Sequence, residues 1–364
     1  RDRDRKDKDR KEKDKKEKQD IKSLFLEELE EQLAALNQPK FRAKQIFSWL
    51  HEKQVTSFED MTNLPAALRQ SLKQQYYIAA AQIARRLQSQ LDGTVKYLFR
   101  FNDGNCVEAV LMKYKYGNSL CISTQVGCRM GCKFCASTLG GLVRSLTASE
   151  MLEEIYAATR DSGQRVSNVV LMGIGEPLDN YDNVLRFLKL LSMPGGYQLS
   201  LRHLSLSTCG VVDKIYQLAQ EDLGLTLSIS LHAPNNEIRS QTMPVNQRWN
   251  VEELVEACRA YFAKTGRRIS FEYALIEGVN DEPCHARELA QRLRGMPAHV
   301  NLIPVNPVKE RGFTRGPRKK IEAFQAQLEK LGVNATIRRE LGADINAACG
   351  QLRREQAQEE ERRC

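Results

Sequence analysis

The chain has 364 residues, 41% of them hydrophobic, which suffices for one large core plus a smaller domain and excludes a wholly disordered protein. Lys and Arg (55) outnumber Asp and Glu (46), a basic balance that suits a polyanion such as RNA but also occurs in many unrelated proteins. No apolar run approaches the roughly 18 residues of a membrane helix, and no secretory signal opens the chain, so we expect a cytoplasmic protein without membrane association. Ten cysteines in that reducing compartment indicate metal binding or catalysis.

The N-terminal part divides into a tail and a helical unit. Residues 1–20 alternate charge too finely for a hydrophobic face, and we expect a disordered tail, with a solvated helix of opposite-charge pairs as the alternative. From residue 21 to about 83, apolar residues recur at helical spacing. This predicts a small all-helical accessory domain, which we bound at 21–90.

A β-hairpin follows the helical unit. Two alternating runs, 94–101 and 106–112, flank the turn sequence Asn102-Asp103-Gly104-Asn105. We expect this hairpin to link the two domains across residues 91–119.

Beyond the hairpin, strand-like runs alternate with helical stretches. Six such runs are found: 120–124, 168–172, 203–208, 225–231, 268–275 and 299–304. Thr147 and Glu150 form a capping-box pattern that opens the helix after the first run. Regular alternation predicts an α/β fold with a parallel sheet, a partial (β/α)6 barrel over 120–354, followed by a charged tail over 355–364.

Three cysteines lie close together just after the first barrel strand. Cys128, Cys132 and Cys135 have the spacing C-x3-C-x2-C on a loop that contains two glycines. Soft sulfur ligands select iron-sulfur clusters or zinc. Three closely spaced thiolates suit a 4Fe-4S cluster with one open iron, whereas zinc, completed by Cys121, is the alternative.

The cysteine motif resembles that of radical S-adenosylmethionine (SAM) enzymes. The segments LCISTQVGC (120–128), FCASTLGG (134–141) and DINAACGQL (344–352) narrow the resemblance to the RlmN/Cfr family of RNA methyltransferases, over 21–354. The resemblance implies a 4Fe-4S cluster, two SAM molecules per turnover, 23S rRNA and tRNA as partners, an electron donor such as flavodoxin or ferredoxin, and a monomer. The resemblance to the RlmN group within this family implies adenosine methylated at carbon 2 as the product, at position 2503 of 23S rRNA and position 37 of tRNA.

Small polar clusters follow four of the predicted strands, where function collects in barrels of this kind. Each cluster alone reads as an ordinary turn, but four together indicate a binding site. By resemblance, these residues contact SAM: Gly175, Glu176, Ser207, Ser230, Leu231, His232 and Asn306. Position 209 is Cys where the family more often has Ser, and we expect a small neutral replacement.

Three further residues have catalytic roles by resemblance. Cys349, which by itself would read as a small buried hydrophobe, is implied to carry a methyl group on sulfur. Cys121 is implied to resolve the RNA crosslink by forming a transient disulfide with Cys349. The position of Glu108 on its predicted strand fits either a solvated edge residue or a functional one. Residues 106–110 resemble the family's sequence at this place, which implies that Glu108 is the general base for the ring proton.

Two segments are candidates for RNA contact. Residues 41–50 mix basic and aromatic side chains within the accessory domain, although we expect Phe47 and Trp49 to belong to the core. Residues 309–320 are the better phosphate-binding candidate because they follow Asn306, with exposed charge as the alternative reading. Their cationic side chains include Arg311, Arg315, Arg318 and Lys319.

Two other functions compete with methylation at carbon 2. The first is a Cfr-type enzyme that methylates carbon 8 of the same rRNA adenosine with the same cysteine pair. Residues 137–141 resemble the carbon 2 group instead. The second is a non-enzymatic, zinc-bearing RNA-binding protein, which would leave the motif around Cys349 unexplained.

Overall fold

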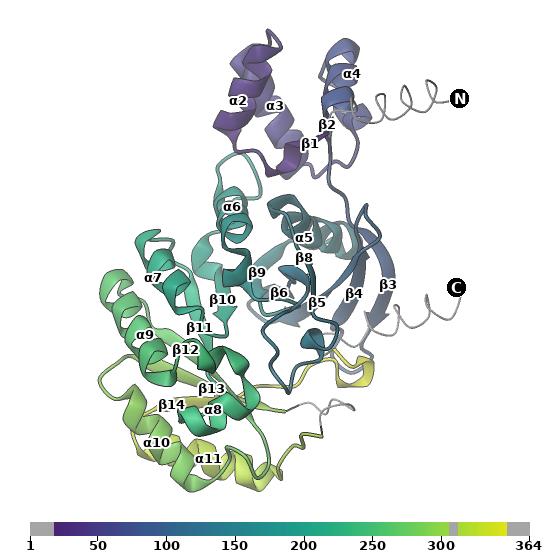
Figure 1. Ribbon diagram of the computed structural model, residues 1–364. Helices are drawn as coiled ribbons and strands as arrows, with labels where there is room; N and C mark the ends of the chain where they lie inside the picture. Colours follow the sequence, from purple (N-terminus) through teal and green to yellow (C-terminus); the bar gives the residue numbers. More distant parts are fainter. Residues whose placement is uncertain (1–17, 306–311, 348–364) are drawn as a thin grey trace, which may run out of the picture.

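The computed structural model describes residues 18–305 and 312–347. Its N-terminal unit contains three α-helices, α2 (Leu26–Ala35), α3 (Lys40–His51) and α4 (Ala66–Gln75), and the 3-10 turns η1 (Ile21–Ser23) and η2 (Phe58–Asp60). Two short parallel strands, β1 (Gln19–Asp20) and β2 (Tyr76–Tyr77), close the unit. These helices lie beyond one end of the main sheet, at the top of Figure 1. The predicted helices are present, but the unit also contains the strand β2, so it is not all-helical.

A single ten-stranded sheet forms the core of the chain, in the order β14-β13-β12-β11-β10-β9-β6-β5-β4-β3. The part from β6 to β14 is parallel, and β3, β4 and β5 are antiparallel. The strands are β3 (Gln82–Gln88), β4 (Val95–Arg100), β5 (Cys106–Tyr114), β6 (Gly117–Cys121), β9 (Val166–Leu171), β10 (Leu204–Thr208), β11 (Thr226–Ser230), β12 (Ile269–Leu275), β13 (Ala298–Pro304) and β14 (Asn334–Ile337). All six predicted barrel strands are present, and the sheet curves into a partial barrel (Figure 1).

Helices cover the outer face of the curved sheet (Figure 1). They are α5 (Ala148–Ser162), α6 (Tyr181–Ser192), α7 (Val212–Gln220), α9 (Val251–Thr265), α10 (Pro283–Leu293) and α11 (Arg318–Lys330), whereas the short α8 (Asn236–Thr242) lies in the connection between β11 and α9. The predicted capping box at Thr147 and Glu150 opens α5, where each side chain bonds the other residue's backbone N–H. The loops carry β7 (Gln125–Gly127), β8 (Leu142–Ser145) and the 3-10 turns η3 (Ala136–Thr138), η4 (Pro177–Asn180), η5 (Leu201–His203), η6 (Pro244–Gln247) and η7 (Ala343–Ile345).

Two strands of the main sheet, β3 and β14, were not predicted from the sequence. The all-helical interval 21–90 contains β3, which pairs with β4 as an edge strand. Most of its side chains are exposed, so it lacks the apolar alternation that identifies a half-buried strand. Strand β14 has only four residues and a single buried position, so its periodicity is too short to recognise. The hairpin β4–β5 also pairs with β6, so it is part of the sheet as well as a connection.

Buried polar contacts join the helical unit to the barrel. Lys22 Nζ lies 2.5 Å from Glu153 Oε1 of α5, and both side chains are fully buried. The Nδ1 of His51 in α3 lies 3.0 Å from the hydroxyl of Tyr156 in α5. Because buried charges are costly unless paired, these contacts fix how the two parts dock. Among the described residues, no helix is both long enough and apolar enough to span a membrane.

Candidate active site

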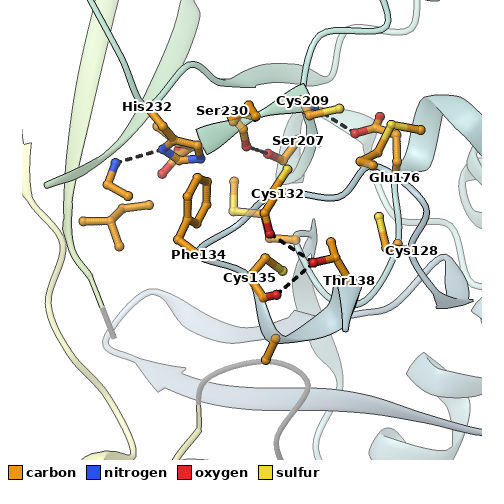
Figure 2. Close-up of a pocket in the computed structure, with 18 of the residues that line it drawn as sticks. Cys128, Cys132, Phe134, Cys135, Thr138, Glu176, Ser207, Cys209, Ser230 and His232 are labelled. Carbon is orange, nitrogen blue, oxygen red and sulfur yellow. Dashed lines mark hydrogen bonds between the residues drawn. The ribbon is translucent and has the colours of Figure 1, made fainter. Parts of the chain in front are cut away.

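A cavity of about 280 Å³ opens at the carboxyl ends of the central strands, beside the loop that follows β7 (Figure 2). Its walls contain eight of the predicted site residues: Cys128, Cys132, Cys135, Gly175, Glu176, Ser207, Ser230 and His232. Parallel strands bring their carboxyl ends to one edge, which explains how residues far apart in sequence meet here.

The three cysteines of the motif come from the loop between β7 and η3. Cys128 and Cys132 are buried and Cys135 is half-buried. The hydroxyl of Thr138 donates to the carbonyl oxygens of Cys132 and Cys135, each at 3.0 Å, which fixes the curvature of the loop (Figure 2). Burial raises the pKa of Cys128 to about 12, and it also raises the pKa of Cys132.

The thiols fit a cluster by their number, their softness and the cavity they share. In the part of the chain that the structure describes, no three metal-binding side chains already converge on one point. The thiols line the wall separately, so ligation requires rotation of their side chains, and metal binding would displace their protons into solvent. Cys121 lines a different cavity, which argues against the four-thiol zinc arrangement.

The loop after β9 requires glycine at two positions. A Cβ on Gly173 would lie 2.5 Å from the carbonyl oxygen of Ile122. Gly175 has a φ of +109°, and a Cβ there would lie 2.6 Å from the Cβ of Gln125. These glycines let the backbone pass close to residues 122–125, and the Gln125 amide oxygen accepts a hydrogen bond from Glu176 N at 2.9 Å.

Glu176 is buried with both carboxylate oxygens bonded to backbone. Oε1 accepts from Leu178 N at 3.0 Å, and Oε2 accepts from Cys209 N at 2.8 Å. Burial raises the pKa of this carboxyl, and the hydrogen bonds oppose that effect. The carboxylate is therefore held rigidly at the cavity wall, where a cationic ligand group would complete its environment. Cys209 is a small buried thiol there, as expected for a neutral replacement.

The predicted residues of β10 and β11 take different positions. The hydroxyls of Ser207 and Ser230 lie 3.2 Å apart on the cavity wall (Figure 2). His232 adopts a left-handed backbone (φ 57°), and its Nδ1 accepts from Ala274 N at 2.8 Å. Burial lowers the pKa of His232 to about 3, so the ring is neutral and its bonded Nδ1 leaves Nε2 as the N–H. Leu231 is fully buried in the core, and its side chain is not part of the wall.

Two charged residues of this site escaped the sequence analysis. Arg239 of α8 is fully buried and bonds the carbonyls of Leu231, Cys209 and Ser230. Glu272 of β12 is buried in the cavity wall and accepts from Asn301 Nδ2 at 2.8 Å. The burial of Arg239 could not be predicted from the sequence, because a basic residue in a polar helix is usually exposed to solvent. Glu272 lies in an apolar strand, and that pattern could have identified it.

A second cavity of about 310 Å³ adjoins the first, and Met172, Ile303 and Arg338 line both. Cys121, at the end of β6, lies in its wall. Cys121 is directly opposite Val110 of β5, and Val110 is directly opposite Lys96 of β4. Residues opposite each other in neighbouring strands share a face, so these three form one row across the sheet.

Glu108 lies one alternation from Val110 on β5 and therefore faces the same side. Its side chain is 2% exposed, so the solvated-edge alternative is wrong. Oε2 lies 3.1 Å from Lys96 Nζ. Glu108 is thus a diagonal neighbour of both Lys96 and Cys121 in the sheet.

Some predicted residues lie outside the described residues. These are Asn306, Arg311 and Cys349. Arg315 lines the second cavity and pairs with Glu340, whereas Arg318 pairs with Glu322 along α11. In the helical unit, Phe47 is buried as expected and Trp49 packs half-buried against the core.

Family models match two parts of the chain. The model of the radical SAM superfamily matches residues 122–290, and that of the ribosomal RNA large subunit methyltransferase N-terminal domain matches residues 19–78. The second match ends before β3, in keeping with the position of that strand in the main sheet.

Relatives of known family match almost the whole chain. A protein of Lachnoclostridium phytofermentans named dual-specificity RNA methyltransferase RlmN is 55% identical, over 92% of this chain and 94% of the relative. A protein of the same name from Caldanaerobacter subterraneus subsp. tengcongensis is 53% identical, over 93% of this chain and 99% of the relative. The crystal structure of a radical SAM methyltransferase from Sphaerobacter thermophilus superposes with a TM-score of 0.87 at 42% identity, over 92% of this chain and 98% of that one.

Proposed function

This chain belongs to the RlmN family of radical SAM RNA methyltransferases, and we propose that it methylates carbon 2 of adenosine in 23S rRNA (position 2503) and in tRNA (position 37). One observation carries the proposal. A cavity lined by the three motif thiols and the strand-end polar groups shares a wall with a second cavity that contains Cys121. A cofactor bound in the first cavity and the thiol of Cys121 in the second can therefore act on the same substrate atom.

The first cavity is proposed to hold the cofactors. Cys128, Cys132 and Cys135 would ligate three irons of a 4Fe-4S cluster, which with SAM supplies reductive cleavage of SAM and hydrogen abstraction from a methyl group. Glu176 would hold the SAM ammonium, and the Ser207 and Ser230 hydroxyls with the neutral His232 would bond its polar atoms. Gly175 and Asn306 complete the proposed contacts, together with the backbone of Leu231, whose side chain lies in the core.

The second cavity is proposed to hold the target adenosine. The sulfur of Cys349 would carry a methyl group from one SAM. Loss of a hydrogen atom from that group to the radical derived from a second SAM would let its carbon join carbon 2, and the adduct would give one electron back to the oxidised cluster. Glu108 would then take the ring proton. The Cys121 thiolate would attack the sulfur of Cys349, so that the disulfide forms, the bond from sulfur to the transferred carbon breaks, and that carbon takes up a proton.

Basic side chains support RNA contact at the same place. Arg315, Arg338 and Arg339 line the second cavity, and Arg338 and Arg339 are exposed at its wall. Among the described residues, neither of these two guanidinium groups has an ion pair. We propose that they bind phosphates beside the target nucleotide and that the helical unit extends the RNA contact. The other partner is a one-electron donor of the flavodoxin or ferredoxin kind, with the chain acting as a cytoplasmic monomer.

The test is an anaerobic assay with reconstituted cluster, reductant, SAM and an rRNA fragment. The intact protein should yield adenosine methylated at carbon 2, Cys349→Ala should yield none, and Cys121→Ala should accumulate an RNA crosslink. Cys258→Ala is the matched control, because this buried thiol of α9 lines neither cavity. Full activity of Cys349→Ala would contradict the methyl-carrier role. Nucleoside mass spectrometry separates carbon 2 from carbon 8, and a protein with zinc and no iron would overturn the proposal.

A further inference from the structure

Lys96 of β4 is a buried cation on the face of the sheet that also bears Cys121 and Glu108. Its side chain is 1% exposed. The ammonium lies 3.1 Å from Glu108 Oε2 and donates to the carbonyl of Asn346 at 2.9 Å. Glu108 and Asn346 are far apart in sequence, so one side chain joins β5 to the C-terminal segment.

The burial of Lys96 needs an explanation, because moving an ammonium group from water into the interior of a protein costs folding free energy. On the opposite face of β4, Tyr97 and Phe99 stack and belong to the main hydrophobic core. The directly opposite residue on β5 is the apolar Val110. A hydrophobic side chain at position 96 would thus fit the sheet, but it would leave the Glu108 carboxylate without its cation.

The segment bonded by Lys96 is held at further points by the turn between β3 and β4. Asp92 Oδ2 accepts from Gly342 N at 2.9 Å. Asp344 accepts from Ser89 Oγ at 2.6 Å and from Gln90 N at 2.9 Å. These contacts define an anchor for residues 342–346, three residues before Cys349 in the sequence.

We propose that Lys96 is a positioning residue with two tasks: it keeps Glu108 ionised and oriented on the active face of the sheet, and it anchors residues 342–346. The first task rests on the proposed function, in which Glu108 is the base, because a base must be unprotonated before it acts. An ammonium at hydrogen-bond distance favours the carboxylate, whereas burial favours the acid. We therefore expect Lys96 to keep Glu108 in its ionised form until Glu108 acts as the base.

The first test needs no turnover. Infrared difference spectra of the full chain, recorded against Glu108→Gln, should show an ionised carboxylate in the intact protein at neutral pH. Lys96→Met keeps the length of the side chain but removes its charge, and it should show a protonated carboxyl instead, absent from Lys96→Met/Glu108→Gln. Lys96→Arg should resemble the intact protein, and Lys264→Met, at an exposed position of α9, is the control.

The outcomes are separable even if Lys96→Met does not fold. In that case Lys96→Gln is used in its place. The infrared difference between the intact protein and Glu108→Gln still shows whether Glu108 is ionised in the intact protein. A protonated Glu108 in the intact protein at neutral pH overturns the proposal. So does an ionised Glu108 in a folded neutral variant.

The second test follows crosslink resolution against pH in the loaded enzyme. The acid limb should move to higher pH in Lys96→Met, because the charge that favours the carboxylate is gone, and Lys96→Arg should restore it. An unmoved limb in Lys96→Met overturns the ionising role of Lys96. If Glu108→Gln resolves the crosslink at the normal rate, Glu108 is not the base, and the proposed function is contradicted at that point. The infrared measurement still tests whether Lys96 keeps Glu108 ionised.

The anchoring task has its own measurement. Hydrogen exchange in residues 342–346 should accelerate at least tenfold in Lys96→Met, with exchange in α9 unchanged. Equal exchange in the intact protein and in Lys96→Met would overturn the anchor.

Discussion

The guanidinium of Arg239 lies against the carbonyl of Cys209, with Nη2 2.5 Å from the oxygen. The same side chain bonds the carbonyl of Leu231 through Nε at 3.1 Å. Cys209 N in turn donates to Glu176. One buried arginine thus ties the ends of β10 and β11 together and, through Cys209, supports the Glu176 carboxylate in the loop after β9.

Replacing Arg239 by Met should destabilise the fold and weaken SAM binding together. The change leaves buried carbonyls without donors, each at about 1–3 kcal/mol, so we expect a loss of at least 2 kcal/mol or so in the free energy of unfolding. Urea unfolding and SAM calorimetry measure the two effects. Arg318→Met, on the exposed face of α11, should change stability by less than about 0.5 kcal/mol. Unchanged stability in Arg239→Met would contradict the assignment.

Gly175→Ala should impair SAM binding more than it impairs folding. Its positive φ and its approach to Gln125 force the loop to move, and strain of this kind costs about 1–3 kcal/mol. Gly224→Ala is the matched control, because Gly224 also has a positive φ but no atom within reach of an added Cβ. Calorimetric SAM titration should therefore separate the two variants. Equal affinities would mean that the close approach at Gly175 is not needed.

Loss of any motif thiol should abolish cluster binding without unfolding the chain. Cys132→Ala removes one of the three proposed ligands, and the purified variant should lack iron and the brown absorbance of the reconstituted protein. Cys258→Ala should retain both. Iron and zinc analysis with visible spectroscopy makes the measurement. Iron retained in Cys132→Ala at the level of the intact protein would exclude this thiol from the cluster.

The docking of α3 on α5 should weaken in acid. Burial, assisted by the charge of Lys22, lowers the pKa of His51 to about 3, so this ring is neutral in the folded state. The unfolded chain takes up its proton below about pH 6.5, so the stability due to the neutral ring is lost as the pH falls from there towards 3. Between about pH 7.5 and 5.5 the intact protein should lose about 1.4 kcal/mol more than His51→Gln in urea unfolding. Equal losses would show that His51 is protonated in the folded state.

The cysteine motif and the polar residues after strands were predictable because each signal is local. C-x3-C-x2-C places three soft ligands on one loop, and parallel strands necessarily bring their carboxyl ends together. Eight predicted residues accordingly line one cavity. The hairpin was equally local, since its turn sequence lies between two alternating runs.

The partners of the charged residues were decided by tertiary structure alone. Lys96 and Arg239 read from the sequence as ordinary strand or helix residues, and only the packing shows that each is buried and bonded. The contacts of Lys96 with Glu108 and Asn346 depend on strand register and on a segment that returns from the far end of the chain. Sequence periodicity reports which face of an element is apolar, but the energy of a buried charge depends on the group it meets across space.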